Sequence, residues 1–140
     1  MLRRGIEDEI LSYCAEHQIG VIGYSPMQKG LLTDKFTLAW AQSLQANDHR
    51  SRDSMFTAPQ LDVNLKLVEG LREIAGVRGM KVSQLAIAWV LRREEITAAI
   101  VGARRPSQIE ETVKAGDWVL TQEEMHAVEA LLQAREAAIN

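Results

Sequence analysis

Two short apolar runs, far apart in the sequence, constrain the fold of this chain more than any other feature. The first is Val21–Tyr24, and the second covers residues 97–101 (Thr-Ala-Ala-Ile-Val). Continuous runs of this kind are typical of strands buried on both faces of a parallel sheet. Helical patterns fill the sequence between them, so we expect parallel pairing and an α/β fold.

Helices are expected where apolar residues recur at a period near 3.6 residues. Residues 6–17 show this spacing before the first strand, and residues 60–77 show it most clearly. Ser83 is a plausible N-cap for a helix over residues 84–92, which is apolar nearly all round. A helix of that composition is expected to pack on several sides.

Two more helices are predicted after the second strand, so the chain supplies only two strands to its sheet. One begins at Pro106 and runs to about Lys114, and a capping-box pattern at residues 121–124 opens the last one. A two-stranded parallel sheet has two edges with unpaired backbone groups, which proteins normally cover. A closed (β/α)8 barrel needs eight strands and about 250 residues, so this chain supplies roughly a quarter of the strands.

The composition is that of one ordinary globular domain. The chain has 140 residues, a formal charge of −3, 46% hydrophobic residues and 25% charged residues. No apolar run reaches the ~18–20 residues of a membrane span, and there is no basic excess to attract nucleic acid. The single cysteine, Cys14, excludes an internal disulfide. With no apolar signal region near the N-terminus, we expect a cytoplasmic protein.

Two polar segments are candidates for ligand binding. Residues 47–59 form a long connection with histidine, arginine and aspartate crowded into residues 49–53. Such a loop either closes over a ligand or is a mobile part of the surface. Residues 104–107 (Arg-Arg-Pro-Ser) place two guanidinium groups after a strand and before a helix, an arrangement that suits an anion.

Other chemistry-bearing side chains have ordinary structural interpretations. Tyr13 alternates with core residues and is expected to be packed, and Cys14 is interpreted as a small core residue. Trp89 and Trp118 are expected to be packing anchors, with an interface role left open for Trp118. We find no metal-ligand cluster in the sequence.

Three stretches of this chain resemble aldo-keto reductases. Residues 20–36 (Gly-Val-Ile-Gly-Tyr-Ser-Pro-Met-Gln-Lys-Gly-Leu-Leu-Thr-Asp-Lys-Phe) resemble the family's seventh strand and the loop after it. Residues 98–112 resemble the eighth strand and the start of the next helix, and residues 81–91 resemble the helix before that strand. The resemblance implies a partial (β/α)8 TIM barrel, with residues 1–140 as a single domain. This C-terminal fragment would hold two parallel strands and about five to six helices.

Members of this family bind NADP(H) in extended form at the carboxyl ends of the strands and transfer hydride to a carbonyl. By this resemblance, Tyr24 stacks on the nicotinamide ring, a role that suits a flat, amphipathic side chain; otherwise it is a buried strand residue. Gly30 allows close approach of the backbone. The residues that line the pyrophosphate would be Ser25, Pro26, Met27 and Lys29.

The same resemblance implies contacts to the rest of the cofactor. Lys35 would reach the cofactor phosphates, and Gly102 and Arg104 would lie by the adenosine 2′-phosphate. Gln108 and Glu111 would face the ribose phosphate and the adenine.

The chain departs from the family pattern at two positions and lacks its catalytic residues. Thr112 stands where the family often has Asn, and Asp34 places a negative charge near the expected phosphates. The family's tetrad of Asp, Tyr, Lys and His comes from the first four strands, and none of the four maps onto this chain. We therefore expect no carbonyl reduction by the chain alone.

The open strand edges imply a partner. We expect either a homo-oligomer or a complementary N-terminal chain that supplies the missing strands. The alternative to a cofactor-binding part of a reductase is a non-catalytic structural fragment that persists as a homo-oligomer with a vestigial nucleotide site.

Overall fold

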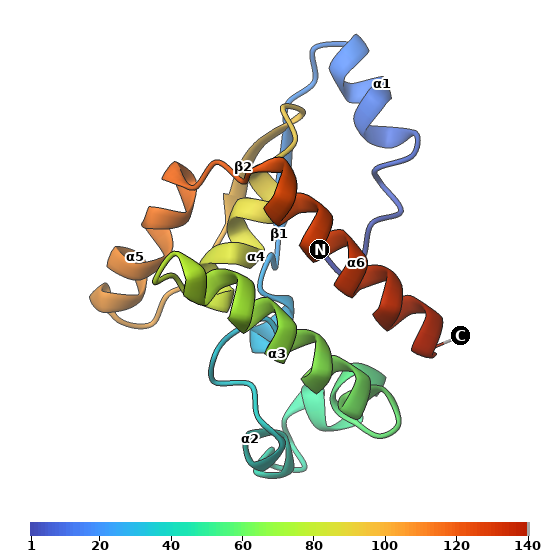
Figure 1. The fold of residues 1–140 in the computed structure, drawn as a ribbon, viewed down its shortest axis with the longest axis vertical. Coiled ribbons are helices and arrows are strands. Elements are labelled where there is room, and N and C mark those ends of the chain that lie inside the picture. Colours follow the sequence, from blue (N-terminus) through green and yellow to red (C-terminus); the bar gives the residue numbers. More distant parts are fainter. Residues whose placement is uncertain (140) are drawn as a thin grey trace.

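The computed structural model describes residues 1–139, which form two strands, six α-helices and four short 3-10 helices (η) (Figure 1). In chain order these elements are α1 (Ile10–Glu16), β1 (Val21–Tyr24), η1 (Gln28–Gly30), α2 (Leu38–Gln42), η2 (His49–Arg52), η3 (Ser54–Phe56), α3 (Gln60–Val77), α4 (Val82–Leu91), β2 (Ile96–Ile100), α5 (Pro106–Thr112), η4 (Val113–Asp117) and α6 (Gln122–Ile139).

β1 and β2 form a two-stranded parallel sheet, which confirms the predicted α/β class. In its register Ile22 pairs with Ala98 and Tyr24 pairs with Ile100. The first strand has the predicted bounds, and the second begins and ends one residue earlier than predicted. Because the strands are parallel, their carboxyl ends lie side by side at the same edge of the sheet.

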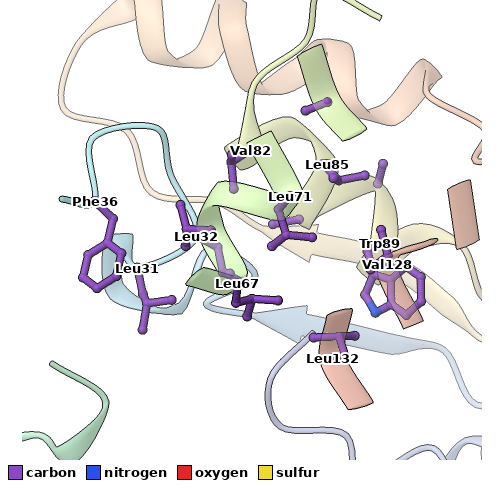
Figure 2. Packing of buried hydrophobic residues seen from close by; sticks show 14 of the residues in the cluster. Leu31, Leu32, Phe36, Leu67, Leu71, Val82, Leu85, Trp89, Val128 and Leu132 are labelled. Atoms are coloured by element: carbon purple, nitrogen blue, oxygen red, sulfur yellow. The ribbon is translucent and has the colours of Figure 1, made fainter. Parts of the chain in front are cut away.

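The hydrophobic core lies where α3, α4 and α6 pack together, and it is closed at one end by the loop before α2 (Figure 2). Every residue of α4 from Val82 to Trp89 is buried, which confirms the prediction that this helix packs on several sides. The side chains labelled in Figure 2 are Leu31, Leu32, Phe36, Leu67, Leu71, Val82, Leu85, Trp89, Val128 and Leu132.

The prediction that both strands are buried on two faces is wrong for the chain as described. Ile22, Tyr24 and Ile100 are 58%, 82% and 59% exposed. α4 covers the opposite face of the sheet, where the Gly23 backbone lies against Val90. An apolar strand sequence indicates that its side chains are buried in the assembled fold, but it does not identify the segment that covers them.

Three predicted helix boundaries also shift. α1 begins at Ile10 rather than at residue 6, because residues 5–9 form turns in which the Leu11 N–H donates to the Ile6 carbonyl (3.0 Å), five residues back rather than four. The N-cap of α4 is Lys81, whose backbone N–H donates to the Gln84 side chain (2.8 Å). Ser83 therefore lies inside the helix and is not its cap. The third shift is at α5, which ends at Thr112 and continues into η4 rather than running to residue 114.

Some interpretations of single side chains are confirmed by the structure, and others are wrong. Trp89 and Trp118 are buried, as expected of packing anchors. Tyr13 is 57% exposed and stacks on His17 with the ring centroids 4.0 Å apart, so it is not a core residue. Cys14 is only partly buried, because α1 projects away from the rest of the molecule (Figure 1).

Among residues 1–139, no single helix is long and apolar enough to cross a membrane. α3 and α4 together have sufficient length and apolar content, but they are bent by 86° across the break between them. Most of their apolar side chains belong to the core shown in Figure 2.

Candidate functional site

The carboxyl ends of β1 and β2 open onto a groove of about 710 Å³. Ligands of parallel α/β sheets bind outside the carboxyl ends of the strands, so this is where a site is expected. Three segments supply the wall: the end of β1 with its following loop, the end of β2 with its following loop, and residues 47–50. The lining residues are Tyr24, Ser25, Pro26, Met27, Lys29, Gly30, Asn47, Asp48, His49, Arg50, Ile100, Gly102 and Arg104.

The structure brings together most of the residues that the sequence analysis assigned to cofactor binding. Those that line the groove are Tyr24, Ser25, Pro26, Met27, Lys29, Gly30, Gly102 and Arg104. Lys35, Gln108 and Glu111 do not line it. Segments some 75 residues apart in the sequence thus meet at one edge of the sheet because the two strands pair in parallel.

The loop after β1 has an unusual backbone. Ser25, Gln28, Lys29 and Gly30 have positive φ angles of 52°, 46°, 57° and 95°. The left-handed region costs a residue with a side chain roughly 1–2 kcal/mol, and such backbone strain concentrates at functional sites. The result is a sharp turn that leaves the Lys29 carbonyl within reach of Arg50, whose Nη1 donates to it at 3.1 Å.

Residues 47–56, which we call the strap, fold back against this loop. Asp48 begins η2 by accepting a hydrogen bond from the Arg50 backbone N–H (3.0 Å), and its carboxylate also pairs with the Arg50 guanidinium (2.6 Å). This pairing holds the pKa of Asp48 well below its usual range. The guanidinium also lies over the Trp40 ring on α2, 4.9 Å from its centroid.

Another ion pair, unlike the one within the strap, joins the strap to the loop after β1. Asp53 accepts from the Lys29 ammonium at 2.9 Å, and this contact lowers the pKa of its carboxyl group. Two cations at the rim of the groove, Lys29 and Arg50, are therefore each bound by a carboxylate of the strap.

Arg104 is the remaining cation of the groove, and no ion pair is recorded for it within residues 1–139. The backbone N–H groups of Arg104 and Arg105 both donate to Gln108 Oε1 (2.8 and 3.2 Å). Gln108 thus completes the N-terminal cap of α5. Arg105 does not line the groove, so Arg104 alone of the pair faces it.

The other predicted residues have structural partners outside the groove. Glu111 pairs with Lys81 and accepts a hydrogen bond from Ser83. Lys35 is exposed. The carboxylate of Asp34 lies 3.7 Å from Arg72, so its charge faces a cation on α3.

Sequence reasoning missed part of the groove. Five lining residues, Asn47, Asp48, His49, Arg50 and Ile100, were not assigned to it, although the polar segment that contains the first four was noted. A local signal was present for the cap alone: an aspartate favours a hydrogen bond from the backbone N–H two residues on, as Asp48 accepts from Arg50.

A second hollow, of about 540 Å³, adjoins the groove and shares Tyr24, Ser25, Pro26 and Lys29 with it. It runs from there past Ile22 to the N-terminal segment, and Val90, Arg92 and Ile96 also line it.

Chemically, the groove suits a ligand that carries both a planar ring and negative charge. The Tyr24 ring is 82% exposed at the end of β1 and offers a flat apolar face. Arg104 offers planar hydrogen-bond donors of the kind that recognise phosphate, and Lys29 is a point charge nearby.

Comparison with known proteins agrees with this geometry. The model of the aldo/keto reductase family matches residues 1–133. An aldo-keto reductase of Bacillus subtilis, YhdN, is 29% identical over 134 residues, which cover 95% of this chain and 40% of that protein. A probable voltage-gated potassium channel subunit beta of Arabidopsis thaliana is 32% identical over 135 residues, with 95% and 41% covered.

The solved structures give the same result. The glycerol dehydrogenase of Gluconobacter oxydans superposes with a TM-score of 0.86 at 32% identity, covering 95% of this chain and 40% of that one. A thermostable aldo-keto reductase, Tm1743, superposes with a TM-score of 0.61 at 23% identity, which shows the fold alone. The chain spans about 40% of the length of the relatives that it matches.

Proposed function

Because the chain belongs to the aldo/keto reductase family, we propose that its groove binds NADP(H). Residues 1–140 are then the cofactor-contacting, C-terminal part of an oxidoreductase that reduces aldehydes and ketones. One observation carries the proposal: an exposed aromatic ring, a glycine with positive φ and an arginine without an ion pair, from two distant segments, line one groove at the carboxyl edge of the sheet.

The residues of the groove fit the parts of this cofactor. Tyr24 would stack on the nicotinamide ring, and Lys29 and Gly30 would hold the pyrophosphate. Arg104 would bind the 2′-phosphate, and the groove has the size of ordinary ligand sites, about 300–1,000 Å³. Bound NADPH would supply a hydride, whereas the residues of this chain bind and orient the cofactor.

We further propose that the chain does not reduce carbonyls by itself. By the family resemblance, the catalytic Asp, Tyr, Lys and His come from the first four strands, and none of the four maps onto this chain. Reduction then requires strands that complete the barrel and carry the catalytic residues.

The proposal is tested by titrating the chain with NADPH and with NADH while nicotinamide fluorescence is followed. Arg104→Gln is expected to weaken NADPH binding about tenfold, the effect of losing one charged hydrogen bond, and to leave NADH binding nearly unchanged. Arg105→Gln, the matched control outside the groove, leaves both affinities unchanged. Absence of NADPH binding at millimolar concentration would overturn the proposal.

A second candidate follows from the exposed sheet. Ile22, Tyr24 and Ile100 present an apolar face on a sheet with two open edges, and soluble proteins normally cover such surfaces. If a second copy of the chain covers it, the protein is a structural homo-oligomer, and its groove is vestigial. Light scattering separates this candidate from the first, since a compact monomer at micromolar concentration would exclude it.

A further inference from the structure

We propose that Asn64 is a positioning residue that fixes the strap at the rim of the groove, and that Arg135 fixes the orientation of the Asn64 amide. The consequence for NADP(H) rests on the proposed function. The anchoring itself is a property of the ligand-free chain and is tested as such.

Asn64 is a fully buried polar side chain on α3, with 0% of its surface exposed. Its Nδ2 donates to the Met55 carbonyl at 2.8 Å, and its Oδ1 accepts from Arg135 Nε on α6 at 2.7 Å. A buried amide without partners is destabilising, and both ends of the Asn64 amide have a partner. Asn64 therefore links the last helix of the chain to the strap.

The chemistry of the two neighbours permits only one orientation of the amide. A guanidinium can only donate and a peptide carbonyl can only accept, so Oδ1 must face Arg135 and Nδ2 must face Met55. Burial lowers the pKa of Arg135, and no ion pair is recorded for it within residues 1–139. A carboxylate at position 64 would pair with Arg135 more strongly, but it would be unable to donate to Met55. An amide at position 64 therefore keeps the hydrogen bond to the Met55 carbonyl of the strap, whereas a carboxylate would form a stronger ion pair with Arg135 on α6 and lose that bond.

From Met55 the link continues to the groove. The Met55 backbone N–H donates to Asp53 Oδ1 at 3.1 Å, and the other carboxylate oxygen of Asp53 accepts from Lys29. Met55 Sδ also accepts from Gln28 on the loop after β1 at 3.2 Å. Because Met55 contacts Asn64 through its carbonyl and Asp53 through its N–H, displacing it would move the carboxylate that binds Lys29.

Two variants break this link at different points, and hydrogen exchange of the ligand-free chain measures the result. Asn64→Asp keeps the acceptor for Arg135 but removes the donor to Met55. Arg135→Met removes the donor to Asn64 without adding a buried charge. Arg135→Lys restores a donor and is the conservative control. Amides of α5 (Pro106–Thr112), which has no bond to the strap, are the internal reference.

We expect exchange of residues 47–56 to rise about tenfold or more in Asn64→Asp and severalfold in Arg135→Met, with α5 unchanged and Arg135→Lys close to the parent chain. Equal acceleration in the strap and α5, or no change in the strap, would overturn the anchoring. NADPH affinity is then measured on the same variants, and it should rise as strap protection falls, because a displaced Asp53 no longer competes with phosphate for Lys29. If the parent chain binds no NADPH, the proposed function fails while the exchange result still decides whether Asn64 anchors the strap.

Discussion

The Lys29 ammonium and the Asp53 carboxylate lie 2.9 Å apart, and they join the two segments that form the rim of the groove. The lysine belongs to the loop after β1, and the aspartate belongs to the strap. A phosphate that entered the groove would compete with Asp53 for the same ammonium. The ion pair therefore orders the ligand-free groove and at the same time opposes an anionic ligand.

Replacing Asp53 by Asn separates these two effects. Asn retains an oxygen that can accept the Met55 N–H, so η3 keeps its cap, but the charge that competes with phosphate is gone. We predict that Asp53→Asn raises NADPH affinity about threefold to tenfold at low ionic strength, with a smaller gain at high salt. Asp117→Asn, which removes an exposed charge distant from the groove, is the matched control in the same fluorescence titration. Unchanged or weaker binding in Asp53→Asn would mean that Asp53 does not oppose the ligand.

Local patterns predicted the elements well because each pattern has a local cause. Val21–Tyr24 is bounded by Gly20 and by Ser25, so the first strand has sharp limits. The capping box at residues 121–124 also forms, since Thr121 and Glu124 bond each other's backbone N–H groups. Features of this kind depend on neighbours within a few residues, which the sequence displays directly.

The contacts between residues far apart in the sequence could not be predicted from the sequence. Asn64 bonds a residue nine positions away and another 71 positions away, and nothing in an α-helical pattern marks it. The exposure of Ile22 depends on which segments cover the sheet, and an apolar sequence does not identify them. Within the groove, the family resemblance indicated Tyr24 and Arg104. The contacts of Asp48 and Asp53 in the strap were found only from the structure.

The packing of β1 against α4 makes a prediction about stability. A Cβ added at Gly23 would lie 3.1 Å from Val90 Cγ1, closer than ordinary van der Waals contact. We predict that Gly23→Ala lowers the free energy of unfolding by about 1–2 kcal/mol through overpacking. Val90→Ala should relieve the contact, so the double variant is expected to lose less than the sum of the single losses. Urea unfolding of the four proteins measures this coupling, and strict additivity would contradict the contact.

The acid dependence of stability should involve Glu7. Burial pushes the pKa of Glu7 upward, but hydrogen bonds from Arg4 and Arg92 outweigh it and leave the pKa below its ordinary value. A carboxyl group with a lowered pKa in the folded state stabilises the fold above its unfolded pKa of about 4.3, and this stabilisation is lost as the pH falls through the folded value.

Glu7→Gln is therefore expected to have a free energy of unfolding about 2 kcal/mol lower at pH 7, since the amide loses the charge and one of the two oxygens that accept from the two guanidinium groups. Between pH 5 and the acid range below 4, the stability of the parent chain should fall more steeply than that of the variant. Urea unfolding at several pH values checks the slope. Parallel curves would show that Glu7 does not titrate with folding.

The last prediction concerns association of copies of the chain through the exposed sheet face. Ile100 is 59% exposed on the sheet, and Val119 is 83% exposed in the segment between η4 and α6. If a second copy covers the sheet, a charge at position 100 would be buried without a partner, which is costly, whereas a charge at position 119 would remain in water. Light scattering should then find the parent chain and Val119→Lys as oligomers and Ile100→Lys as a monomer at the same micromolar concentration. Equal masses for all three proteins would show that the sheet face is not the contact between copies.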